Sequence, residues 1–138
     1  MRPVVIASVL LVGLSVAGCG GSKKKTTGCP PPPSTSSAGN AQISAKAVGA
    51  SFNKVIVIHA TEKSNGAPVH GDLTVNAQMT CPHFMPMYTK ALPETSAGTY
   101  KGAYSLVMPG NWTFNIILRA KNGDATTSSL PVTVKPSG

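Results

Sequence analysis

The clearest structural signal in this chain is the stretch WTFNIILR, residues 112–119. Apolar side chains fill its even positions and polar side chains most of its odd positions, and only Ile117 breaks the alternation. Successive side chains of a strand point to opposite faces of a sheet, so the stretch predicts a strand with one buried face that begins at Trp112. Asn122-Gly123 is typical of a tight hairpin, and we expect a last strand over roughly residues 125–135.

Similar patterns lie upstream. The run VIVI at 55–58 is β-branched throughout, apolar side chains alternate from Leu73 to Met79, and Tyr100, Tyr104 and Leu106 share a face. About seven short strands, frequent turn signals and no convincing helix predict an all-β, immunoglobulin-like β-sandwich. An up-and-down or Greek-key barrel is the alternative.

The N-terminus has the layout of a targeting segment. Arg2 precedes an apolar run over residues 4–16, which is shorter than the about 20 residues of a comfortable membrane span. The sequence Val16-Ala17-Gly18-Cys19 resembles the lipobox of bacterial lipoproteins, in which the cysteine thiol carries a diacylglycerol. We therefore expect a signal peptide over residues 1–18 and lipidation of Cys19. An ordinary secreted protein with a free Cys19, or an uncleaved N-terminal anchor, is the alternative.

Residues 19–39 contain three consecutive lysines, four consecutive prolines and many Ser and Thr, which cannot build a core. Such a composition favours an extended or flexible tether. We expect this tether to hold a domain at residues 40–138 on the periplasmic or extracellular side of a cell membrane or outer membrane. Its lysines could touch anionic headgroups, although a merely solubilising role explains them equally well.

Charge and motif content argue against several functions. The net charge of the whole chain is +8, but the lysines of the domain are scattered singly, so nucleic-acid binding is not expected. The chain has four Asp and Glu residues, widely spaced, and no phosphate-binding loop or nucleophile elbow, so we do not expect an enzyme.

The unusual segment is MTCPHFMPM, residues 79–87. Its soft or borderline donors all have odd numbers, so in an extended chain they point the same way. Proline cannot donate to a sheet ladder, so Pro82 and Pro86 place the segment at an edge or in a loop. Sulfur and imidazole ligands suit cuprous copper, whereas the spacing matches no zinc motif. The candidate metal ligands are Cys81, His83, Met85 and Met87, with Met108 as a further candidate.

Other interpretations of these residues remain open. Methionine fills irregular gaps in apolar cores, so the segment could be packing. With Cys19 lipidated, Cys29 and Cys81 are the only remaining pair, and the compartment outside the inner membrane is generally oxidising. A Cys29–Cys81 disulfide would pin the tether to the domain and remove Cys81 as a ligand. His59 and His70 are weaker candidates, expected at a strand end and in an exposed turn.

Three short pieces, Met85-Pro86-Met87, Gly98-Thr99-Tyr100 and Met108-Pro109-Gly110 followed by Trp112, resemble the YtkA-like family and, more distantly, FixH-like proteins. The resemblance implies a small extracytoplasmic immunoglobulin-like domain associated with copper handling and cytochrome oxidase assembly. Carried over by position, it implies roles for Met85, Met87 and Met108. Family members often have histidine directly after the first piece, where this chain has Tyr88.

Two functions follow as hypotheses. The first is a membrane-anchored lipoprotein that binds cuprous copper and delivers it to a membrane protein or an oxidase assembly factor. The second is a metal-free interaction module that is tethered beside a membrane protein complex.

Overall fold

The computed structural model describes residues 29–30 and 37–136, and these residues form strands and no helix. Within this part of the chain there is accordingly no helix able to cross a membrane. The strands are β1 (Ala41–Val48), β2 (Asn53–Glu62), β3 (Gly71–Cys81), β4 (Met85–Leu92), β5 (Glu94–Ser96), β6 (Thr99–Ser105), β7 (Gly110–Ala120) and β8 (Ala125–Val134).

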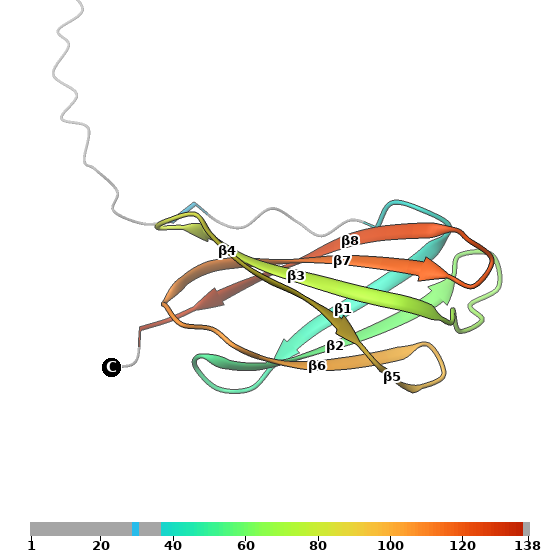
Figure 1. Ribbon diagram of the computed structural model, residues 1–138, viewed down its shortest axis with the longest axis horizontal. Helices are drawn as coiled ribbons and strands as arrows, with labels where there is room; N and C mark the ends of the chain where they lie inside the picture. The colour runs from blue at the N-terminus through green and yellow to red at the C-terminus, as the bar shows by residue number, and fades with distance from the viewer. Residues whose placement is uncertain (1–28, 31–36, 137–138) are drawn as a thin grey trace, which may run out of the picture.

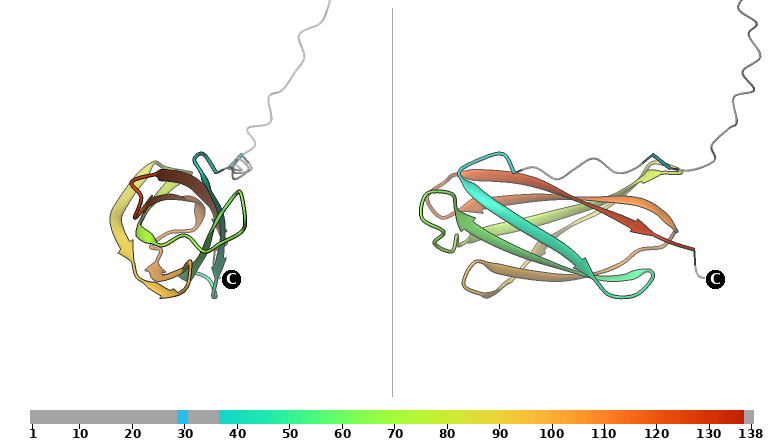
Figure 2. Two further views of the ribbon diagram at one scale, coloured as in Figure 1. Left: turned by 90° about the vertical axis from the view of Figure 1, so that its right-hand side faces the viewer. Right: turned by 180° about the vertical axis from the view of Figure 1, so that it is seen from behind.

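The strands form two antiparallel sheets packed face to face (Figure 1). One sheet has the order β1-β2-β6-β5 and the other β4-β3-β7-β8. Seen end-on, the two sheets curve around a common core, with β1 and β8 side by side along one edge (Figure 2). Separate hydrogen-bonded ladders make this a sandwich, so the predicted all-β sandwich is confirmed.

The central pair of the second sheet, β3 and β7, is built from the two most regular alternations of the sequence. Inward residues of β3 lie directly opposite inward residues of β7, as in the pairs Met79–Trp112 and Val75–Ile116. All of these side chains are fully buried, and removing each from water stabilises the fold by about 1.5–3 kcal/mol. Ile117, which breaks the alternation, is on the outer face and 38% exposed.

Two tyrosines join the sheets across the core. The ring of Tyr104 on β6 meets that of Phe114 on β7 edge to face, with centroids 5.1 Å apart. The hydroxyl of Tyr104 donates to the carbonyl of Val75 on β3 at 3.2 Å, and that of Tyr100 donates to the carbonyl of Val69 at 3.0 Å. The hydroxyl of Tyr100 also lies 3.4 Å from the carbonyl of Gly71 on β3, so both tyrosines of β6 reach the backbone of the opposite sheet.

The chain changes sheets at Pro93. β4 is an edge strand of one sheet, and β5 continues from it as an edge strand of the other. Leu92 is buried at this crossing, and its side chain lies over Gly102 of β6, where a Cβ would overlap it. The edge position of β4 agrees with the expectation drawn from Pro86, because an edge strand leaves one side of its backbone without a sheet partner.

The sandwich has two ends, which we name after one residue each. The Cys81 end consists of the β1–β2 hairpin (49–52), the β3–β4 turn (82–84) and the β6–β7 loop (106–109). The His70 end consists of the β2–β3 connection (63–70), the β5–β6 turn (97–98) and the β7–β8 turn (121–124). β8 leads the chain back to the Cys81 end.

Candidate functional site

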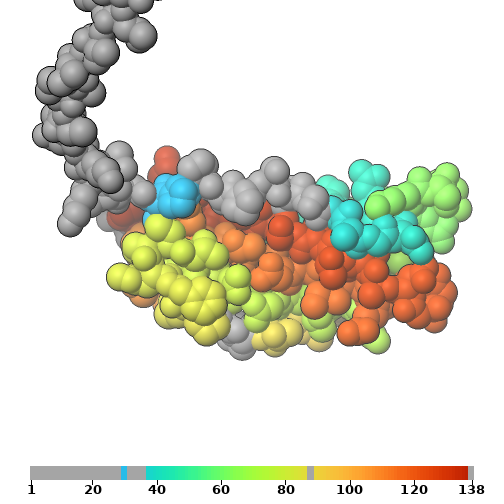
Figure 3. Space-filling model, turned by 90° about the horizontal axis from the view of Figure 1, so that it is seen from above, coloured from blue at the N-terminus to red at the C-terminus, as the bar shows by residue number. Residues whose placement is uncertain are grey.

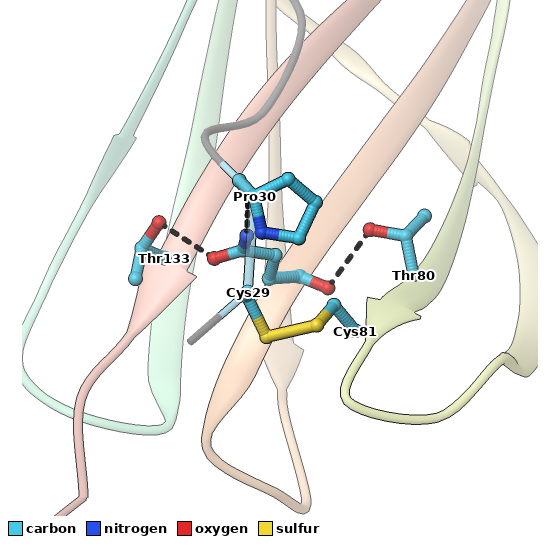
Figure 4. Close-up of a disulfide and its surroundings, with 6 residues drawn as sticks. Cys29, Pro30, Thr80, Cys81 and Thr133 are labelled. Carbon is cyan, nitrogen blue, oxygen red and sulfur yellow. Dashed lines mark hydrogen bonds between the residues drawn. A yellow bond between two sulfur atoms is a disulfide. The ribbon is translucent and has the colours of Figure 1, made fainter. Parts of the chain in front are cut away.

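Cys81 is joined to Cys29 by a disulfide, with the two Cα atoms 5.7 Å apart (Figure 4). Of the two roles that the sequence left open for Cys81, the structure shows the disulfide. Its sulfur is bonded and carries no thiolate, which is the form that binds a metal. The prediction that Cys81 is a copper ligand is therefore wrong for this oxidised state of the chain.

The disulfide belongs to a larger attachment centred on Asn111, which is only 6% exposed. Its amide nitrogen donates to the carbonyl of Pro30 at 2.7 Å, and its amide oxygen accepts from the hydroxyl of Thr133 at 3.0 Å. The hydroxyl of Thr80 donates to its backbone carbonyl at 3.3 Å (Figure 4). Every polar group of the Asn111 side chain is thus satisfied only when Pro30 lies on the sheet.

A second attachment lies further along the chain. Ala38 forms two backbone hydrogen bonds with Thr127 of β8, at 2.9 and 2.8 Å. Cys29 and Ala38, which belong to the segment that we expected to be a free tether, are therefore bound to the domain, one toward each end of the sandwich.

Segment 79–87 is not one continuous strand, which the predicted common face of its odd-numbered donors assumed. A register shift separates Met79 from Cys81 in the pairing of β3 with β7, and the chain then reverses before β4 begins at Met85. Each of these irregularities interrupts the two-residue period on which the prediction depended. Met79 is fully buried, Cys81 is partly buried, and His83 is exposed in the turn.

His83, Met85 and Met108 all lie at the Cys81 end. Met85 lies opposite Met79 in the ladder, and both Met85 and Met108 are half-buried against the core. The Met108 carbonyl accepts a hydrogen bond from the indole nitrogen of Trp112 at 3.1 Å, which holds the β6–β7 loop in place. The side chain of Met87 lies outside the described residues.

The β6–β7 loop approaches the β3–β4 turn closely because of a glycine. Gly110 has φ +145°, and a Cβ there would overlap the carbonyl oxygen of Cys81. A residue with a side chain would push the two loops apart. The loop that carries Met108 and the turn that carries His83 therefore lie at the same end of the sandwich.

The donors at this end are one exposed imidazole and two or three thioethers. Among the described residues, no group of three or more His, Cys, Asp or Glu side chains could hold a metal ion. Thioether and imidazole suit cuprous copper and are a poor set for zinc or calcium. Imidazole and thioether are the donor types of the predicted copper site, and His83, Met85 and Met108 are the described residues that would hold the ion; the site itself stays a prediction.

A hydrogen-bonded pair at the other end of the sandwich, His70 and Glu94, was not identified by the sequence analysis. The Nδ1 of His70 lies 2.6 Å from Oε1 of Glu94, and the same oxygen accepts the backbone N–H of Gly98 at 2.6 Å. The Gly98 N–H, together with His70 and Lys121, lowers the pKa of Glu94 against the opposing effect of desolvation. Burial, reinforced by the charge of Glu94, raises the pKa of Tyr100.

The His70 end also contains a pocket of about 350 Å³. Its floor is apolar, with Ala41 and Val69, and its rim carries both signs of charge, including Glu62, Lys121 and Asp124. The amide of Asn40 donates to Asp124 at 2.9 Å, so part of this rim is occupied by its own contacts. The pocket and the candidate metal ligands lie at opposite ends of the sandwich.

Comparison with known proteins bears on the fold and its methionine segment. The sequence profile of the YtkA-like family matches residues 35–116. This chain belongs to the YtkA-like family. The YtkA-like region starts well upstream of the pieces that suggested it, and it includes β1 to β6 and every candidate metal ligand. Cys29 precedes the YtkA-like region, and no curated protein matches the chain.

Proposed function

We propose that this chain is a membrane-anchored lipoprotein that binds cuprous copper at the Cys81 end and passes it to a membrane protein or an oxidase assembly factor. The observation that carries the proposal is the gathering of His83, Met85 and Met108 at one end of a YtkA-like domain. Lipidation of Cys19 supplies the membrane anchor. The soft donors, and the low content of acidic residues, favour copper over harder ions.

The burial of each donor suggests its part in the site. His83 is exposed and would meet an incoming ion first. Met85 and Met108 are half-buried, so their thioethers are supported by the core and lose little freedom when an ion binds. Met87 would complete the set.

The disulfide gives this ligand set a useful chemical property. Because Cys81 is bonded to Cys29, the site contains imidazole and thioether and no thiolate. A thiolate ligand would itself be open to oxidation in an oxidising compartment, whereas imidazole is not. Copper would then be held without the strong thiolate bond and would remain available for transfer.

A competition titration tests the proposal. The chain is titrated with cuprous copper against bathocuproine in ascorbate, with the disulfide intact. We expect one copper per chain in the parent and a loss of at least tenfold in affinity in His83→Ala and Met85→Leu. The Met85→Leu change nearly conserves volume, so it should leave the fold intact.

His59 offers a matched control. It is also exposed, but it lies on β2 with its Nδ1 3.0 Å from the hydroxyl of Thr99, away from the methionines. His59→Ala should therefore bind copper like the parent. If the parent does not compete with the chelator, the methionines are packing residues and the metal-free interaction module is the better account.

A further inference from the structure

The Cys81 end carries the two most exposed large apolar side chains among the described residues. Phe84, in the β3–β4 turn, is 69% exposed, and Val107, in the β6–β7 loop, is 64% exposed. Val48 and Val55, which pair beside the β1–β2 hairpin, are 43% and 38% exposed. Single exposed apolar residues are common, but here two loops of one end each present one, and two more flank the third loop.

These loops form a connected surface. The backbone N–H of Leu106 donates to the carbonyl of Phe52 at 2.8 Å, which joins the β6–β7 loop to the β1–β2 hairpin. The close approach of Gly110 to Cys81 joins the same loop to the β3–β4 turn. The apolar tips of this end are therefore held in fixed relative positions by backbone contacts.

Charge is distributed unevenly between the two ends. All four acidic residues of the chain lie in the loops of the His70 end or within two residues of a strand terminus near it. They are Glu62, Asp72, Glu94 and Asp124. The Cys81 end has none, and Lys54 and Lys135 lie beside its loops. The His70 end carries Lys63 and Lys121 beside its acidic residues, whereas the Cys81 end combines exposed apolar side chains with lysines and has no acidic residue.

The disulfide attaches the tether to this same end. In Figure 3 the blue Cys29–Pro30 atoms lie against the yellow atoms of the β3–β4 region. About ten residues separate Cys19 from Cys29, a reach of about 35 Å at most. If the disulfide and the Pro30–Asn111 hydrogen bond are both lost, the first remaining contacts are those of Ser37 and Ala38, toward the other end of the sheet, and the reach would be about 65 Å. The short tether includes the three lysines at 23–25.

We infer that the Cys81 end is a docking surface for an anionic phospholipid bilayer. Phe84 and Val107 enter the interface of this bilayer, and Lys54 and Lys135 contact its headgroups. This deepens the proposed function and rests on its lipid anchor at Cys19. Apolar side chains enter the boundary between headgroups and acyl chains, and each lysine near an anionic surface strengthens binding about fivefold. A lipid surface fits better than a protein partner because the anchor already brings this end to it.

The docked orientation has a consequence for copper transfer. His83 immediately precedes Phe84, so docking brings the exposed imidazole to the level of the headgroups. The protein that receives the copper would then meet the domain at the membrane surface, and the His70 end would face away from the membrane.

Depth-dependent fluorescence quenching tests the orientation. The core lies entirely between Ala41 and Val134, so a chain that starts at Cys19 keeps the whole fold. With Cys29 and Cys81 in the disulfide, Cys19 is the only thiol and can be coupled to a maleimide lipid in vesicles. Two variants are compared, Phe84→Trp at the Cys81 end and Ser64→Trp, an exposed position at the His70 end. The signal of buried Trp112 is subtracted with the parent chain.

We expect brominated phosphatidylcholine to quench the Phe84→Trp signal at least threefold more than the Ser64→Trp signal when the vesicles contain phosphatidylglycerol. The difference should shrink in high salt and in the Cys29→Ser/Cys81→Ser background, where the tether is longer. Equal quenching of the two variants, or quenching of neither, overturns the inference. Copper affinity is measured without vesicles, so a failure of docking and a failure of copper binding are separate results.

Discussion

Removal of the Cys29–Cys81 disulfide should destabilise the domain by about 2 kcal/mol. The bond closes a loop over a sequence separation of 52 residues, and loop-closure entropy alone sets a ceiling of about 4 kcal/mol. The loss of stability should be smaller than this upper limit, because removing the bond also increases the conformational entropy of the folded chain. The arm before Ala38 would be released from Cys81, and the net effect scales with the logarithm of the ratio of the two loop lengths, which gives about 2 kcal/mol.

The assay is urea unfolding followed by the fluorescence of the single tryptophan, Trp112, which is fully buried. Cys29→Ser/Cys81→Ser is made in a Cys19→Ser parent, which retains the disulfide and serves as the control. The variant should unfold at lower urea with a steeper m-value, because its unfolded chain is less compact. An unchanged midpoint and m-value would refute the reasoning that this bond constrains the unfolded chain.

Three further predictions concern the two ends and the core. Tyr100→Phe removes the hydrogen bond to the Val69 carbonyl and should cost about 1 kcal/mol at neutral pH. Because the pKa of Tyr100 is raised in the folded chain, stability should fall as the pH rises above about 10 in the parent, and urea unfolding of Tyr100→Phe should show a smaller fall. The lowered pKa of Glu94 stabilises the fold at pH values above 4.5, the ordinary pKa of the group, and this contribution is lost as the pH falls through the lowered pKa. Urea unfolding of Glu94→Gln should therefore show a smaller loss of stability in acid than the parent. An equal loss would count against a stabilising contact between Glu94 and His70. Gly110→Ala should lower the free energy of unfolding by about 2 kcal/mol or more. Gly66→Ala is the control, because Gly66 also has a positive φ but has open space around it, and this variant should lose less stability. Equal losses would show that the close approach of Gly110 to Cys81 is unimportant.

The sequence predicted the regular part of the fold well. In β3 and β7 the two-residue period persists from Leu73 to Met79 and from Trp112 to Leu118, so the buried faces and the sandwich followed from the pattern. The edge strand at Pro86 followed from the missing N–H of proline. The change of sheet at Pro93 could not be predicted, because it depends on Leu92 packing over Gly102, residues that belong to different sheets.

The candidate site was predicted only in part. The composition of segment 79–87 identified its soft donors, but their common face depended on a regular strand, and the register shift after Met79 ended that regularity. The choice between thiolate and disulfide for Cys81 depended on whether Cys29 comes within bonding distance, which no local pattern encodes. The contact between His70 and Glu94 joins two turns of the fold, and neither residue has a neighbour in sequence that indicates it.

The disulfide also determines where mechanical load enters the domain. A pull on the N-terminal segment would, without the bond, act through Ala38 on edge strand β1 and open its hydrogen bonds one after another. With the bond, the same pull acts on Cys81 at the end of β3, a central strand held by β4 on one side and β7 on the other. A force transmitted from the membrane through the tether would therefore act on β3, which is paired on both sides. It would not act directly on the edge strand β1.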